Sequence, residues 1–165
     1  KFDVGGVVLD IYSTDEVQNA YNQIVESVKE KNPTAKIQGI QVSKQIEKGT
    51  EVILGIKKDP SFGTVVMFGM GGIFVEVFRD VSFRIAPVDK AMAMEMIQEI
   101  KASELLTGAR GTKEADTDAV AEAIVGLSHL AADCNQIKEL DINPLIVLPK
   151  NKGCYVADTK IILEK

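Results

Sequence analysis

Residues 139–145 read Glu139-Leu140-Asp141-Ile142-Asn143-Pro144-Leu145, and both the fold and the chemistry can be argued from this stretch. Successive side chains of an extended strand point to opposite faces, so Glu139, Asp141 and Asn143 share one face. Pro144 has no N–H to donate to a strand ladder, so we expect regular pairing to falter just beyond Asn143. The pattern predicts a strand with a polar site at its end.

The following residues predict a hairpin. Residues 149–153 (Pro-Lys-Asn-Lys-Gly) read as a turn between strands 145–148 and 154–158. With Leu148 opposite Cys154, Asp158 falls opposite Pro144 and diagonal to Asn143, a register argued to within one residue. Two interpretations remain open here. One is a solvated acidic face with Asn-Pro as ordinary turn chemistry, and the other is a site for a hard cation such as Mg2+.

Composition bounds the class of protein. The 165 residues are 45% hydrophobic and 26% charged, which is typical of one globular domain. A net charge of −5 without a Lys/Arg cluster disfavours nucleic acid, and no apolar run predicts a membrane segment. We expect Cys134 and Cys154 to be buried and reduced in a cytoplasmic protein. The chain opens on Lys1 and a Gly pair instead of Met, so we expect an upstream segment to be missing.

Periodicity predicts an α+β fold. A short strand over 7–12 should precede a helix that begins after Ser13, where Ser-x-x-Glu forms a capping pattern. Two further helices are expected from Asp89 and from Asp116, the second with a buried stripe that ends at Cys134. The helices should cover mainly one side of an antiparallel sheet. Its expected strands are residues 37–46, 51–57, 64–68 and 73–85, followed by the acidic hairpin.

Two other features have both structural and chemical interpretations, and the single histidine has a structural one. Gly69-Met70-Gly71-Gly72 lies between two strands, so it is either a tight turn or a close backbone approach to a phosphate, with Glu76 nearby. Arg110, in a glycine-flanked loop, is either a phosphate contact or a surface residue. His129 lies within a helix without a partner motif and is expected to be a surface or packing residue.

Several motifs in this order resemble the ATP-grasp (beta) subunit of ADP-forming acetyl-CoA (acyl-CoA) synthetases, which is related to the succinyl-CoA synthetase beta chain. The resemblance runs nearly end to end. The motifs are Asp3-Val4-Gly5-Gly6-Val7, Asp59-Pro60-Ser61-Phe62-Gly63, residues 66–73 (Val-Met-Phe-Gly-Met-Gly-Gly-Ile), Asp80-Val81-Ser82-Phe83-Arg84, residues 105–111 (Leu-Leu-Thr-Gly-Ala-Arg-Gly) and residues 139–145.

This resemblance implies an ATP-grasp fold, with residues 1–36 ending a first subdomain and 37–165 forming a second. It implies Mg2+ and ATP/ADP as cofactors in an acid-thiol ligase that converts acyl-CoA, ADP and phosphate to acid, CoA and ATP. The implied partner is a CoA-binding alpha subunit or fused domain that carries a phosphohistidine, in a heterotetrameric assembly.

The resemblance also implies residue roles. Asn143 and Asp158 are similar to magnesium ligands, with Asp141 as a secondary one. The expected nucleotide contacts are Ser43, Lys44, Gln45, Ile46, Glu51, Gly71 and Gly72, and the expected catalytic residues are Arg110 and Glu76. The family commonly has Gln and Met where this chain has Ser43 and Gln45. At these two positions we therefore expect contacts to the adenine base from the backbone and not from the side chains.

Two rival assignments are a non-catalytic regulatory domain of the same fold, fused for example to a protein acetyltransferase, and the succinyl-CoA synthetase beta chain itself. An intact acidic hairpin favours the catalytic form over the first. The Gly-Gly turn and the Arg110 loop read closer to the acyl-CoA type than to the second.

Overall fold

The computed structural model describes residues 5–72, 80–108 and 113–164. Contacts divide the chain into two compact units, Lys1–Gln45 and Ile46–Lys165. Glu76 and Arg110, both expected to be catalytic, lie outside the described residues. Within the described part, no helix is long and apolar enough to cross a membrane.

The first unit is built around one helix, α1 (Thr14–Lys31). Ser13 caps it by accepting a hydrogen bond from the backbone N–H of Glu16 at 3.3 Å, and the Glu16 carboxylate accepts from the N–H of Tyr12 at 2.6 Å. The helix stops at Asn32, which precedes a proline that would clash with a further helical turn. The predicted capping pattern is therefore confirmed.

The strands predicted at 7–12 and 37–46 are wrong, because neither segment forms regular secondary structure. A strand is stabilised by a neighbour that takes up its backbone hydrogen bonds, and no described strand lies beside either segment. Side chains join them instead. Asp10 and Gln45 are linked by two hydrogen bonds of 2.7 Å, one from the N–H of Asp10 and one from the Gln45 amide.

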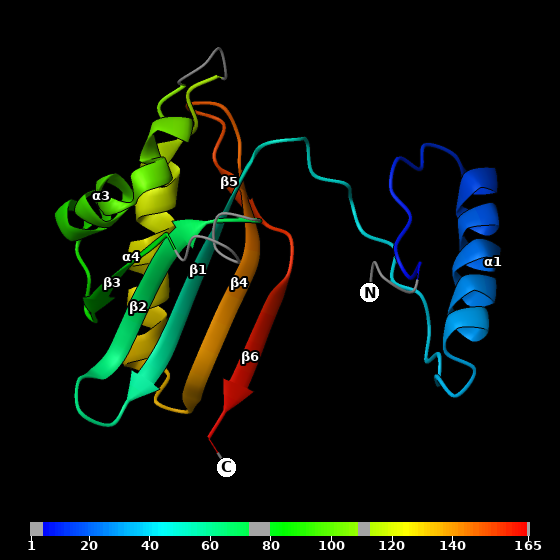
Figure 1. Cartoon of the computed structure of the whole chain (residues 1–165), viewed down its shortest axis with the longest axis horizontal. Helices are drawn as coiled ribbons and strands as arrows, with labels where there is room; N and C mark the ends of the chain where they lie inside the picture. Colours follow the sequence, from blue (N-terminus) through cyan, green and yellow to red (C-terminus); the bar gives the residue numbers. More distant parts are fainter. Residues whose placement is uncertain (1–4, 73–79, 109–112, 165) are drawn as a thin grey trace. The chain divides into compact units, whose positions relative to one another are not determined.

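The second unit contains a sheet whose described strand pairs are all antiparallel. The strand order is β3-β2-β1-β4-β5, and β6 also pairs with β4 (Figure 1). The predicted strands at 51–57 and 64–68 are confirmed, and the strand predicted at 73–85 is described only from Asp80 onward. The strands are β1 (Thr50–Asp59), β2 (Gly63–Met70), β3 (Val81–Ile85), β4 (Ile137–Val147), β5 (Cys154–Val156) and β6 (Thr159–Leu163).

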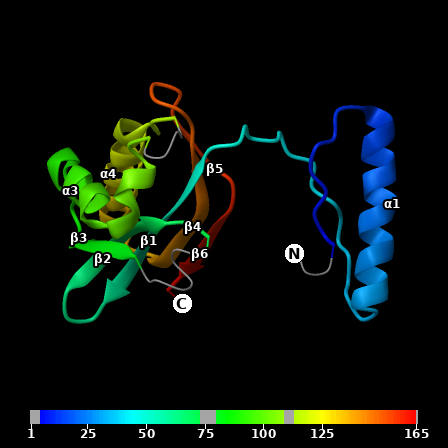
Figure 2. The same ribbon diagram turned by 45° about the horizontal axis from the view of Figure 1, so that its top comes forward.

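Helices α3 (Lys90–Glu99) and α4 (Thr117–Asp133) cover one face of this sheet, as Figures 1 and 2 show. A 3-10 helix, η1 (Lys101–Leu105), follows α3, so the regular α-helix expected from Asp89 ends at Glu99. Asp89 and Asp116 cap the two helices, since each side chain accepts a hydrogen bond from the N–H of the residue three positions further on. The predicted one-sided α+β architecture is confirmed.

The hydrophobic core lies between the helices and the sheet. Phe68, Leu54 and Ile124 are fully buried there, and burial of each such side chain contributes about 1.5–3 kcal/mol. Cys134 was expected to end the buried stripe of α4, but it is exposed because the helix ends one residue earlier. Cys154 is half-buried, and both thiols are free.

Candidate metal and nucleotide site

The acidic hairpin forms as predicted, but its register differs by one residue. Val147, not Leu148, lies opposite Cys154, because the N–H of Leu148 closes the turn on the carbonyl oxygen of Gly153 at 3.0 Å. This register places Asp158 directly opposite Asn143, whose N–H donates to the Asp158 carbonyl oxygen at 3.1 Å. The observed register therefore brings Asn143 and Asp158, the two proposed magnesium ligands, closer together than the predicted register would.

On its other side, β4 is interrupted where Pro144 predicted. Val52 pairs with Leu145 and Leu54 pairs with Ile142, so a single β1 residue faces both Asn143 and Pro144. This bulge changes the alternation of side chains along β4. Leu140 and Ile142 before it, and Leu145 and Val147 after it, all pack on the core, which leaves the polar residues to the opposite face.

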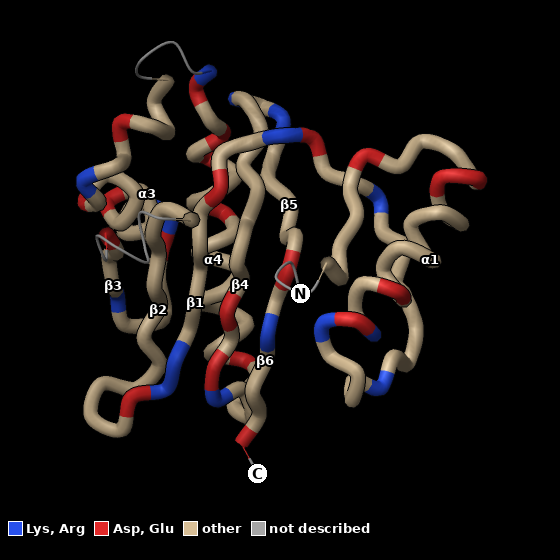
Figure 3. Tube along the Cα trace, turned by 45° about the vertical axis from the view of Figure 1, so that its right-hand side comes forward, with Lys and Arg blue, Asp and Glu red and all other residues tan. Residues whose placement is uncertain are grey.

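Several acidic side chains lie on the face of the sheet opposite the core. The pKa of Asp141 is raised above its ordinary value, chiefly by burial and then by repulsion from the carboxylates of Glu139 and Asp158. Lys160 acts in the opposite direction. It lies opposite Asp141 in β6, and Figure 3 shows a basic position on β6 beside the acidic positions of β4. Lys160 was not predicted from the sequence, although continuing the strand beyond Asp158 would have placed it near the acidic residues.

A hollow of about 350 Å3 opens beside Asp141. Gly55 lies on its lining, opposite Asp141 on one side and Met67 on the other. A Cβ there would lie 3.3 Å from the Met67 methyl group. Phe83 and Met67 supply an apolar wall, and Glu139 and Asp141 supply an acidic one.

Two predicted nucleotide contacts are brought together at the start of β1. The N–H of Gly71 donates to the carbonyl oxygen of Glu51 at 2.8 Å, and a Cβ on Gly71 would lie 2.9 Å from that of Glu51. Gly72 follows with a φ of +63°, a left-handed conformation that favours glycine. The Glu51 side chain remains exposed and can bind a ligand.

Four predicted nucleotide contacts lie in the irregular connection, namely Ser43, Lys44, Gln45 and Ile46. The boundary between the two compact units falls between Gln45 and Ile46. The backbone groups of this connection are not engaged in a described strand, so they can contact a ligand, whereas the Gln45 amide is held by Asp10.

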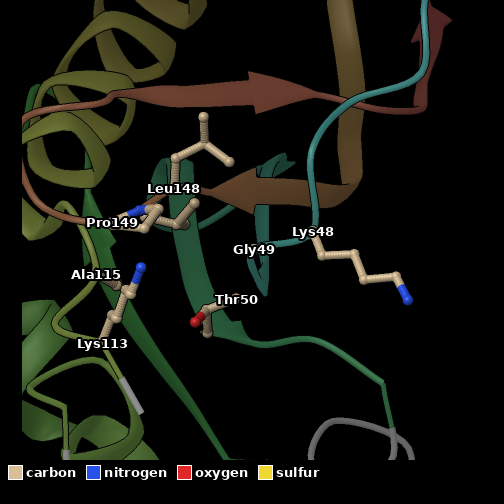
Figure 4. A pocket seen from close by; sticks show the side chains of 8 residues that line it. Lys48, Gly49, Thr50, Lys113, Ala115, Leu148 and Pro149 are labelled. Carbon is tan, nitrogen blue, oxygen red and sulfur yellow. The ribbon is translucent and has the colours of Figure 1, made fainter.

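A second hollow of about 230 Å3 lies where β1 begins and β4 ends, lined by Thr50, Lys113, Leu148 and Pro149 among others. Figure 4 shows the ammonium group of Lys48 pointing away from Lys113 and from the other lining residues. Because these charges do not converge, this hollow is not built as an anion site.

The donor set of the hairpin fits Mg2+. The Asn143 amide and the carboxylates of Asp158 and Asp141 are hard oxygen donors, which Mg2+ prefers. Among residues 5–72, 80–108 and 113–164, no group of three acidic, histidine or cysteine side chains is close enough to hold a metal. Such a partial shell suits an ion that keeps several waters and is shared with substrate phosphates.

This fold, with its oxygen-rich strand end and glycine turn, is that of a nucleotide-binding domain. Residues 1–163 match the model of the ATP-grasp domain, and the chain belongs to the ATP-grasp family, in the branch found in ADP-forming acetate–CoA ligases. The beta subunit of acetate–CoA ligase (ADP-forming) I from Pyrococcus furiosus is 42% identical over 163 residues, which are 99% of this chain and 69% of that subunit.

Two further comparisons extend this result. The 4-hydroxybutyrate–CoA ligase (ADP-forming) of Nitrosopumilus maritimus is 44% identical over 98% of this chain, which spans only 23% of that relative. A dinucleotide-forming acetyl-coenzyme A synthetase 1 of Ca. Korarchaeum cryptofilum, solved with coenzyme A and Ca-AMPCP, is 46% identical with a TM-score of 0.92. This match covers 99% of this chain and 70% of that one.

Proposed function

We propose that this chain is the nucleotide-handling part of an ADP-forming acyl-CoA ligase. It would transfer a phosphoryl group between ADP/ATP and a phosphohistidine of a partner, in a cycle that converts acyl-CoA, ADP and phosphate to acid, CoA and ATP. The observation that carries the proposal is the pairing of Asn143 with Asp158 beside Asp141, which gathers oxygen ligands at one strand end.

In this proposal each group of residues has a separate role in binding or transfer. Asn143 and Asp158 hold Mg2+ and Asp141 adds charge beside it, while bound Mg2+ would neutralise the phosphate oxygens during transfer. Glu51 binds the ribose, Gly71 and Gly72 allow close backbone approach, and the connection at residues 43–46 contacts the base. Arg110 steadies the transferred group, and Glu76, near the glycine turn, is the second proposed catalytic residue.

The partner would be a CoA-binding alpha subunit, or a fused domain, that carries the phosphohistidine. A relative from Ca. Korarchaeum cryptofilum, 42% identical with a TM-score of 0.86, was solved with Mg-AMPPCP and with its phosphohistidine segment pointing towards the nucleotide binding site. We infer the same approach here, in a cytoplasmic enzyme.

The test uses the full-length subunit or fused protein with its partner. Asn143→Ala and Asp158→Ala should each lower magnesium-dependent ATP formation by roughly 100-fold or more, the scale of removing one group that stabilises charge during the reaction. Asn22→Ala and Asp133→Ala are matched controls, because both residues are exposed and lie in α1 and α4. Full turnover in a folded Asn143 or Asp158 variant would refute the site. Magnesium-nucleotide binding by the unmodified protein without turnover would indicate the regulatory alternative.

A further inference from the structure

A buried carboxylate joins the start of α4 to the turn of the acidic hairpin. Asp116 is 7% exposed, and its two oxygens accept separate backbone hydrogen bonds. Oδ1 accepts from the N–H of Ala119 at 3.2 Å, which caps the helix. Oδ2 accepts from the N–H of Gly153 at 2.8 Å, across 37 residues of chain.

The same junction is held on the other side of the turn. The backbone N–H of Asp116 donates to the carbonyl oxygen of Leu148 at 2.9 Å, and Ala115 forms a bridge with Pro149. Figure 4 shows Ala115 beside Leu148 and Pro149 at this point. Asp116 therefore contacts both residues, Leu148 and Gly153, whose own hydrogen bond closes the turn.

Closure of the turn determines which residues meet five positions further on. Leu148 is five residues after Asn143, and Gly153 is five residues before Asp158. Each residue added on one strand is matched by one on the other, so pairing Leu148 with Gly153 places Asp158 opposite Asn143. A slip of one residue would instead turn the Asp158 side chain to the other face of the ribbon.

We propose that Asp116 is a positioning residue for the metal site, which sets the register that brings Asp158 to Asn143. The inference rests on the proposed function, because it assumes that these two residues hold Mg2+. Capping alone does not require aspartate, since Asn and Ser cap helices about as well. A side chain with two acceptor oxygens is needed here because one accepts from Ala119 to cap the helix and the other accepts from Gly153 in the turn.

The experiment compares Asp116→Asn and Asp116→Ser with Asp89→Ser in the full-length protein. Both Asp116 variants keep one acceptor for Ala119 and lose the one for Gly153. Asp89 caps the other helix, α3, by accepting a hydrogen bond from the N–H of Met92, so its variant tests the loss of a helix cap.

Two readouts are measured on folded protein. In the absence of metal and nucleotide, amide hydrogen exchange at Asn143 and Ala157, which donate across the ribbon, should become about 10-fold faster in the Asp116 variants. The Mg2+ concentration that half-saturates nucleotide binding, followed by calorimetry, should rise about 10-fold or more, as when a supporting contact of a metal ligand is removed. Asp89→Ser should change each value less than about 2-fold.

Asp158→Ala, measured in the same way, distinguishes failure of the positioning role of Asp116 from failure of the proposed metal site. If Asp158→Ala raises the half-saturating Mg2+ concentration and the Asp116 variants do not, the positioning role is refuted while the metal site stands. If Asp158→Ala has no effect, the proposed metal site itself is wrong. If amide exchange at Asn143 is slower or unchanged in the Asp116 variants, Asp116 does not set the register of the hairpin, whatever the effect on the half-saturating Mg2+ concentration.

Discussion

Asp141 is the residue whose charge state is most affected by its neighbours. Burial, Glu139 and Asp158 raise its pKa, and Lys160 lowers it. A carboxyl whose folded pKa lies above its unfolded value disfavours the folded state when ionised. In the metal-free protein this penalty is present at neutral pH, and it disappears as the pH falls through the folded pKa and below the ordinary value of 3.8.

We therefore expect Asp141→Asn to raise the free energy of unfolding of the metal-free protein at pH 7. The gain should be below about 1 kcal/mol, because the side chain is only partly buried and water screens the repulsion. Urea unfolding measured from pH 7 down to pH 3.5 should show the gain shrinking as Asp141 becomes protonated in both states.

Variants of its neighbours act as controls with opposite signs. Glu139→Gln removes a repulsive charge and should lower the pKa of Asp141, whereas Lys160→Ala removes an attractive one and should raise it. NMR titration of the Asp141 carboxyl would detect both. Shifts in the same direction would contradict the electrostatic account.

At the scale of elements, the glycine turn after β2 is held against the start of β1. Gly71 lies so close to Glu51 that a Cβ would meet the Glu51 Cβ at 2.9 Å and its carbonyl oxygen at 3.0 Å. Backbone atoms cannot move aside as a flexible side chain can. The contact therefore explains why the chain uses glycine here.

Gly71→Ala should cost about 1–3 kcal/mol of unfolding free energy, the usual range for overpacking, and should weaken nucleotide binding. Gly126→Ala is the matched control. It lies in α4 with nothing within 4 Å of the added methyl group, so it should stabilise the protein by up to about 1 kcal/mol. Chemical denaturation of both variants would show the difference in sign, and a neutral Gly71→Ala would contradict the close contact.

At the scale of the whole molecule, the two units differ in how much core they contain. Among the described residues of Lys1–Gln45 only Ala20 is buried, while Leu9, Tyr12 and Val42 are exposed. The connected hydrophobic cluster runs from Val52 to Val147 and lies entirely in the second unit. The second unit therefore has the means to fold by itself.

A protein comprising residues 46–165 should unfold cooperatively within about 4 °C of the 165-residue chain, a difference of less than about 1 kcal/mol. A peptide of residues 1–45 should be largely unfolded, because one isolated helix is marginal in water. Circular dichroism and calorimetry on the two pieces would check this. Loss of cooperative unfolding in 46–165 would show that the first unit completes the core.

The sequence by itself determined the elements whose signals are local. Ser13, Asp89 and Asp116 marked helix starts, alternation marked β1, β2 and β4, and Pro144 marked the interruption of β4, because caps, periodicity and a missing N–H act within a few residues. The oxygen donors at Asn143 and Asp158 were readable for the same reason.

Only the tertiary structure decided how distant segments meet. It placed Asp158 opposite Asn143, because the turn closes from Leu148 to Gly153 and Asp116 binds that turn from 37 residues away. It also brought Gly71 onto Glu51, set Lys160 beside Asp141, and left residues 37–46 without a partner among the described strands. Pairing and close approach depend on what lies across the sheet, which the local pattern of one segment does not contain.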